Sequence, residues 1–168
     1  MAPVSVARET NSGLAVLDGK IYFVGGRNPT NQNLVERYDP VTNQWEALPQ
    51  MSGQRAVLGV AALNGKIYAM GGEGLSTVEI FDPATNQWST GPSLPTNVSH
   101  GDAITIGGKI LLIGGKSNSS QNEDQVLELD SANNSWSYKA PMPTARHGIK
   151  VVLFEGKVWA IGGNGGTD

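Results

Sequence analysis

The chain has 168 residues, carries a net charge of −3 at pH 7 and contains no cysteine. The absence of thiol groups excludes disulfides, thiolate catalysis and cysteine metal sites, and the low, slightly acidic charge provides no basic patch for nucleic acid. No apolar run reaches the length of a membrane span and the first ten residues lack the apolar core of a signal peptide, so the cellular compartment stays open.

A phrase of eight residues, Gly-Lys followed by four apolar residues and a Gly-Gly doublet, occurs four times in the chain. The doublets begin at residues 25, 71, 114 and 162 and are therefore separated by 46, 43 and 48 residues. A second phrase, an Asp followed six residues later by a Trp, keeps the same spacing in three places. A recurring period of this length indicates a repeat architecture. The repeated residues are Gly25, Gly26, Gly71, Gly72, Gly114, Gly115, Gly162, Gly163, Trp45, Trp88 and Trp136.

Each repeat is predicted to form four short strands, of which the first is an almost continuously apolar run. A two-residue turn follows, and the Gly-Lys phrase then forms the second strand. Asp18-Gly19, Asn64-Gly65 and Gly107-Gly108 suit a type I′ turn, in which both positions need positive φ, whereas Glu155-Gly156 fits it less well. The predicted first strands are 14–17, 57–63, 103–106 and 149–154.

The second half of each repeat begins with a polar loop of variable length and a third strand, which leads into an Asp turn. Asp39, Asp82 and Asp130 are expected to open these turns through a side-chain acceptor, and the Asn four residues later tolerates a left-handed exit. The fourth strand carries the Trp, and a Pro-containing segment then ends the unit, because Pro cannot lie within a central ladder.

This pattern resembles the kelch repeat. The matching features are the Gly-Gly doublet, an aromatic residue before the Asp turn (Tyr38 and Phe81), the Trp, and an Arg ten residues before the Gly-Lys pair (Arg55 and Arg146). The resemblance covers essentially the whole chain and implies an all-β fold of kelch-type β-propeller blades, each with four antiparallel strands. The departures from the pattern are Leu129 at the aromatic position, Ser131 at the Pro, Leu111 and Trp159 at the Tyr, and Val98 at the Arg.

In such a fold the doublets let neighbouring backbones approach closely, and the Trp, Tyr and Phe side chains pack one blade on the next. We therefore expect these residues to be structural, and we predict no cofactor. The chain is expected to be a single kelch domain with repeats at about 2–50, 51–95 and 96–143 and a half-repeat at 144–168.

Three and a half blades cannot close a ring, so an apolar blade face and unpaired strand edges would stay open. Either the chain is part of a longer propeller, or copies of it complete one another. Segments 14–17 and 158–161 are as apolar as the interior copies and form no polar cap. We expect a homo-oligomer, with a two-fold dimer favoured, that closes the ring.

Two sets of charged residues could bind a ligand. Arg8, Arg55 and Arg146 lie near the start of first strands, a region that in kelch propellers tends to face the top or the central channel; the alternative is that each packs its stem and bonds nearby carbonyls. His100 and His147 differ by one place in the repeat register, which on a strand turns side chains to opposite faces, so we expect no symmetric metal pair. The candidate partner-binding residues are Arg8, Arg55, Arg146, His147, Arg27, Asn28, Asn31, Asn33, Glu73, Lys116 and Asn118.

The leading functional hypothesis is a non-catalytic scaffold for a protein or peptide partner, as the resemblance implies, although fold alone does not fix function. One alternative is part of a sugar-acting kelch enzyme such as a sialic-acid mutarotase, which would need Arg, Glu and His converging on a channel. A copper-dependent galactose oxidase fits poorly, because its cofactor requires a Cys. The third hypothesis is an engineered or evolutionary half-propeller that assembles into a ring. No nucleic-acid or membrane partner is predicted.

Overall fold

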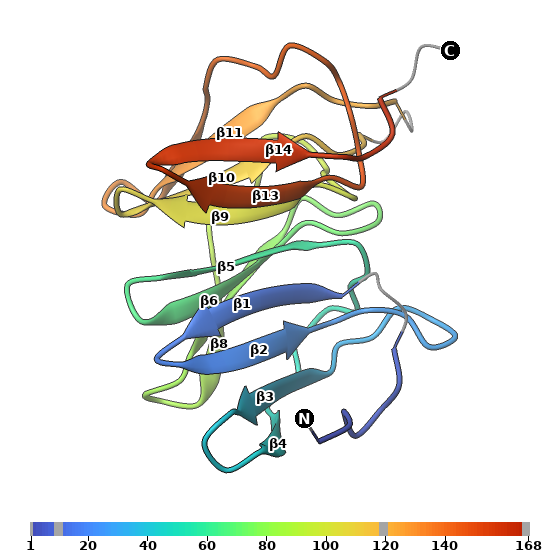
Figure 1. Ribbon diagram of the computed structural model, residues 1–168, viewed down its shortest axis with the longest axis vertical. Coiled ribbons are helices and arrows are strands. Elements are labelled where there is room, and N and C mark those ends of the chain that lie inside the picture. The colour runs from blue at the N-terminus through green and yellow to red at the C-terminus, as the bar shows by residue number, and fades with distance from the viewer. Residues whose placement is uncertain (1, 9–11, 118–120, 166–168) are drawn as a thin grey trace.

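The computed structural model describes residues 2–8, 12–117 and 121–165, and its strands form a row of small sheets (Figure 1). Three sheets have four antiparallel strands in chain order, and a fourth sheet has two. The predicted all-β class and the four-stranded blades are confirmed. The described part of the chain contains no helix long and apolar enough to cross a membrane.

Each blade runs from an inner strand to an outer strand. The strands are β1 (Gly13–Leu17), β2 (Lys20–Val24), β3 (Val35–Asp39) and β4 (Gln44–Leu48) in the first blade, β5 (Gly59–Leu63), β6 (Lys66–Met70), β7 (Val78–Asp82) and β8 (Gln87–Thr90) in the second, β9 (Asp102–Ile106), β10 (Lys109–Ile113), β11 (Val126–Asp130) and β12 (Ser135–Tyr138) in the third, and β13 (Lys150–Phe154) and β14 (Lys157–Ile161) in the half-blade.

The turns follow the predicted chemistry. Asp18, Asn64 and Glu155 all have φ near 50°, as a type I′ turn requires, so Glu155 adopts a conformation that Asn and Gly accept more readily. In the Asp turns the backbone N–H of Val41 donates to Asp39 Oδ1 at 2.8 Å, and equivalent bonds recur in the next two repeats. The Asn residues that end these turns have φ of 52–58°.

Of the predicted first strands, the second differs most from the observed strand, and the other three differ by one residue. The apolar run 57–63 was expected to be extended throughout, but β5 begins only at Gly59. Val57 has a φ of 54°, in the left-handed region, which interrupts an extended strand. The equivalent places in the next repeats, His100 and Gly148, have φ of 58° and 65°. The kink is therefore a regular feature of the segment before each of these inner strands.

The blades are held together by apolar clusters between neighbouring sheets. Tyr22 and Val24 of the first blade pack against Ile67 and Phe81 of the second, and all four are at most 2% exposed. Trp88 packs at the edge of the same cluster, and its indole N–H donates to the carbonyl of Pro49, which follows the last strand of the first blade (2.7 Å). Phe81 and Trp88 of the second blade thus lie in the cluster that joins it to the first blade.

The inner strands β1, β5, β9 and β13 lie side by side in that order (Figure 1). The tight turns lie at one end of the blades, and the loops that follow β2, β6, β10 and β14 lie at the opposite end. Within the described residues the sheets do not close into a ring, and β14 has a neighbour on one edge only.

Candidate functional site

The loops after the glycine doublets lie at one end of the molecule, where each of the first three doublets docks on the next blade. Gly72 N–H donates to Val98 O at 2.9 Å, and a Cβ on Gly71 would lie 2.3 Å from that same oxygen. The first and third doublets make the same type of contact, with the carbonyls of Arg55 and Arg146. Glycine is required at Gly71 for this approach, and we call the end of the molecule that carries the loops the loop end.

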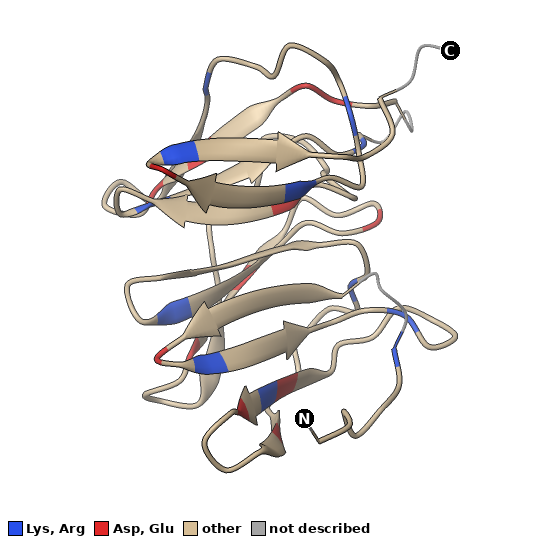
Figure 2. Ribbon diagram, in the orientation of Figure 1, with Lys and Arg blue, Asp and Glu red and all other residues tan. Residues whose placement is uncertain are grey.

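A hollow of about 320 Å³ lies at the loop end between the second and third blades. Glu73 and Gly74 line it from the loop after β6, His100 from the segment before β9, and Lys116 from the loop after β10. Figure 2 shows that charged residues lie largely at strand ends and in loops, whereas β1 carries none. Charged side chains thus lie at both ends of the blades, and those of Glu73 and Lys116 line the hollow at the loop end.

The charges around the hollow are partly matched. Arg27 Nη2 lies 2.5 Å from Glu73 Oε2, and Asn31 Nδ2 donates to the same oxygen at 3.3 Å. Burial raises the pKa of Glu73, but the bonds from Arg27 and Asn31 outweigh it, so the net pKa is lowered and the carboxylate stays charged. The ion pair joins the loops of the first and second blades. Lys116 adds a second positive charge to the lining of the hollow, beside the Glu73 carboxylate that Arg27 already neutralises.

His100 and His147 meet at this end, contrary to the expectation that they would point to opposite faces. Their ring centroids lie 5.6 Å apart with the ring planes perpendicular. The alternation rule fails because both residues precede their strands and His100 has a φ of 58°. Burial, and then repulsion from His147 when it is protonated and from Lys116, lower the pKa of His100. Burial and then Lys116 lower the pKa of His147. The pair is therefore neutral at neutral pH.

Among the residues that the structure describes, no group of three His, Asp or Glu side chains is placed to hold a metal ion. His147 Nδ1 instead lies 2.6 Å from Asn122 Oδ1. Asn122 is a residue that the sequence analysis missed. It lies in a loop of variable length, where no periodic marker singles it out.

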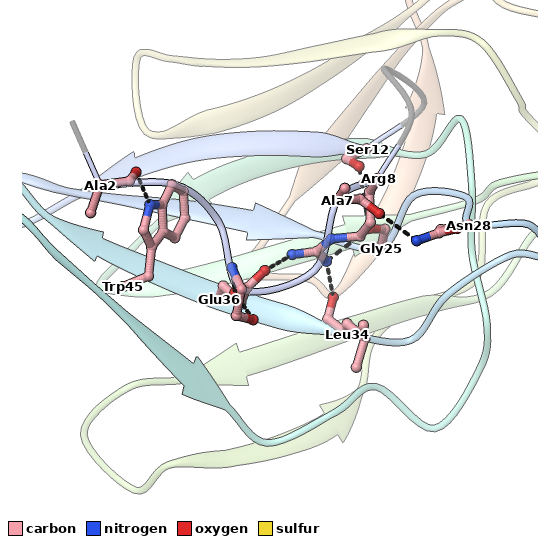
Figure 3. A network of polar contacts seen from close by, with 10 residues as sticks. Ala2, Ala7, Arg8, Ser12, Gly25, Asn28, Leu34, Glu36 and Trp45 are labelled. Carbon is pink, nitrogen blue, oxygen red and sulfur yellow. Dashed lines mark hydrogen bonds and ion pairs between the residues drawn. The ribbon is translucent and has the colours of Figure 1, made fainter.

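Arg8 and Arg55 lie inside their blades. Arg55 is 2% exposed, and its Nη2 donates to Glu79 Oε1 at 2.8 Å while its Nη1 donates to Gly71 O at 2.8 Å. Figure 3 shows the same arrangement in the first blade, where Arg8 bonds Glu36 and the carbonyl of Gly25. These guanidinium groups hold the second strand, the third strand and the preceding segment together, and they offer a ligand no exposed surface.

The third blade replaces both members of this ion pair at once. Val98 stands at the place of Arg55 and Leu127 at the place of Glu79, and both are at most 2% exposed. A buried carboxylate needs its partner, so an exchange of one residue alone would leave an unpaired charge. The position that Arg8 and Arg55 share is therefore structural in these blades. The sequence itself shows that the third repeat replaces both the Arg and its Glu partner.

The remaining candidates are spread over the loop end. Asn28 Nδ2 donates to Ala7 O at 2.6 Å, as Figure 3 shows, and Asn33 Nδ2 donates to Met51 O at 3.1 Å, so both tie loops to linking segments. Asn118 lies outside the described residues. The structure thus gathers Arg27, Asn31, Glu73, Lys116 and His147 near one hollow or its rim.

Comparison with known proteins agrees with these features. The Kelch motif family matches residues 10–52, 55–95 and 99–143. An alignment over 81 positions, which covers 43% of the chain and 14% of the relative, is 35% identical to mouse Kelch-like protein 28. An alignment over 70 positions, which covers 39% of the chain and 12% of the relative, is 40% identical to zebrafish Kelch-like ECH-associated protein 1A. The chain therefore matches only a small part of each relative. The three family matches, the doublets that dock on the next blade and the four-stranded sheets establish that this chain belongs to the kelch-repeat family.

Proposed function

We propose that the chain is a kelch binding module whose loop end receives a protein or peptide partner and that it acts without catalysis. The observation that carries this proposal is the hollow of about 320 Å³ lined by Glu73, His100 and Lys116. Its walls come from loops of two blades, and loops on a rigid scaffold are the usual place for binding residues.

The charges favour a partner with an acidic side chain. Glu73 is already paired with Arg27, so it does not offset the ammonium group of Lys116. The two imidazoles beside Lys116 are neutral at neutral pH but still present ring nitrogens that can bond a carboxylate or a backbone group. A protein partner is also in keeping with the name of the zebrafish relative, which describes that protein as ECH-associated.

A peptide selection tests this proposal. Peptides with Asp or Glu would be selected from a random library against the chain, and their affinity measured by calorimetry. Lys116→Glu should weaken binding at least tenfold, since a charge-assisted bond becomes a repulsion. Lys139→Glu, which changes an exposed charge on the outer side of the third blade, should leave affinity unchanged. Equal affinity for the two variants would reject the loop end as the binding site.

The sugar-acting alternative rests on the meeting of Arg27, Glu73 and His100 at one rim, because Arg, Glu and His are the groups that it needs. The ion pair between Arg27 and Glu73 occupies two of the three, which is why we favour a binding module. Sugar titration followed by NMR exchange separates the two functions: exchange between anomers accelerated by the chain, and abolished by Glu73→Gln, would favour the enzyme.

We further propose that a second copy of the chain covers the open face of the half-blade. Val152, Phe154, Trp159 and Ile161 are 42–60% exposed there and line a hollow of about 440 Å³. In complete blades the equivalent face packs against the first strands of the next blade, and β1 offers such a surface through the exposed residues Leu14 and Val16. Two copies could therefore cover each other's open ends with two-fold symmetry.

Light scattering tests the self-association. The unaltered chain should have the mass of two chains, and Trp159→Glu should reduce it to one, because it places a charge in the apolar contact. Tyr138→Glu, at a position 59% exposed on the outermost strand of the third blade, is the control and should keep the double mass. A folded particle of single-chain mass that is stable on dilution would reject this proposal without touching the peptide site.

A further inference from the structure

Arg146 in the half-blade makes part of an arrangement that is complete in the first and second blades. Its Nη1 donates to Gly162 O at 3.0 Å, as Arg55 Nη1 does to Gly71 O at 2.8 Å. In the second blade the guanidinium goes on to bond Glu79 on the third strand. Within the described residues, the bond to Gly162 is the one side-chain hydrogen bond of Arg146.

The strand register gives the place of the absent carboxylate. Glu79 pairs opposite Ala69 on β6, and Glu36 pairs opposite Phe23 on β2. The equivalent residue of β14 is Ala160, which pairs with β13 on its other edge. A strand added to the open edge of β14 in the same register would hold its carboxylate opposite Ala160.

The same register specifies the neighbours of that carboxylate. Val78 lies opposite Met70 and Phe81 opposite Ile67 in the second blade, and both are fully buried. The counterparts of Met70 and Ile67 on β14 are Ile161 and Val158. The incoming strand therefore needs an apolar residue one place before the carboxylate and an aromatic residue two places after it. The chain's own third strands contain this pattern as Val-Glu-x-Tyr and Val-Glu-x-Phe.

An apolar strand would not serve in place of an acidic one. The third blade has leucine at the carboxylate position, but there Val98 replaces the Arg. The half-blade keeps Arg146, and covering its guanidinium with an apolar strand would bury an unpaired charge. Pro143 stands where Ser52 donates a backbone N–H to Glu79, so the carboxylate would depend on Arg146 for more of its binding.

We propose that the open edge of β14 binds a β-hairpin whose first strand carries a carboxylate two places before an aromatic residue, with Arg146 as the group that selects the carboxylate. This site differs from the loop end, because it acts through an unpaired strand edge and strand addition. It also differs from the apolar face proposed to meet a second copy, because the hairpin extends the sheet sideways.

Two synthetic peptides test the proposal: residues 76–91 of the chain, which form β7 and β8, and the same peptide with Glu79→Gln. Fluorescence anisotropy should give at least tenfold tighter binding of the acidic peptide to the unaltered chain. On an Arg146→Gln chain the two peptides should bind equally. Lys139→Gln, the control, should keep the preference. Equal binding of both peptides to the unaltered chain would overturn the proposal.

Isolated hairpins are marginally stable in water, so a second measurement uses the chain extended through a Gly-Ser linker by residues 76–91. The extended chain with Glu should melt several degrees above the extended chain with Gln, and Arg146→Gln should abolish the difference. Equal melting temperatures of the Glu and Gln forms would likewise show that the edge does not select a carboxylate. Loss of peptide binding on raising the chain concentration would assign the edge to a second copy instead.

Discussion

The second blade and the half-blade begin with the same pair of strands but differ in what covers them. Met70 is fully buried and Tyr68 is 7% exposed, whereas their counterparts Ile161 and Trp159 are 55% and 49% exposed. The local sequence is equally apolar in both. The difference shows that a kelch strand pair is only half of a packing unit, and that the neighbouring blade and the outer strands provide most of its burial.

The largest expected effect is the difference in stability loss between truncation of Trp88 in the second blade and truncation of Trp159 in the half-blade. Trp88→Ala should destabilise the chain by about 3–5 kcal/mol, which is comparable with the whole stability of a small domain, because Trp88 packs on the first blade and bonds Pro49 O. Trp159→Ala removes a half-exposed ring and should cost less than about 1 kcal/mol in dilute single chains. Thermal melting measures both. Similar losses for the two variants would contradict the comparison.

The next effect compares the buried and the open arginine. Arg55→Val should cost about 3–5 kcal/mol because it leaves the Glu79 carboxylate buried without its partner. Adding Glu79→Leu, which recreates the third-blade pair, should restore most of that stability. Arg146→Val should cost about 1 kcal/mol, the net value of one hydrogen bond. Urea unfolding of the four chains decides the matter, and a double variant no more stable than Arg55→Val would speak against the structural role of the pair.

The two doublet glycines give a third contrast. A Cβ at Gly71 would clash with Val98 O, whereas a Cβ at Gly162 would meet nothing within 4 Å in the described structure. Both have φ between 64° and 69°, so both Ala variants bear a left-handed strain of about 1–2 kcal/mol. Gly71→Ala should therefore lower the melting temperature clearly more than Gly162→Ala. An equal decrease would mean that backbone conformation alone explains the doublet.

The smallest effect concerns pH. Because the pKa of His100 is lowered from 6.5, chiefly by burial and then by His147 and Lys116, its contribution to stability is present above pH 6.5 and is lost as the pH falls through the lower folded value. The neighbouring Glu73 raises this pKa and Arg27 lowers it further. The melting temperature should thus decrease from pH 7 to pH 5, and His100→Gln should flatten the decrease. An unchanged slope in this variant would assign the effect to other groups.

Much of the fold could be predicted because single residues that recur in every repeat identify its turns and its packing positions. The doublets, the Asp turns and the Trp positions each have a local physical reason, and each recurs at the same place in the structure. The role of Arg55 was harder to predict, because it depends on Glu79, 24 residues away on another strand. The contact between His100 and His147 depends on a left-handed residue before a strand, which the alternation rule does not describe.

Amide hydrogen exchange in the unaltered chain tests most directly whether neighbours, rather than local sequence, stabilise a strand pair. The measurement uses a concentration at which light scattering reports single chains, and it compares the bonds that pair β5 with β6 and β13 with β14. We predict that the β13–β14 amides exchange on the order of a hundredfold faster than the β5–β6 amides, through local opening. Equal protection of the two pairs would contradict the account.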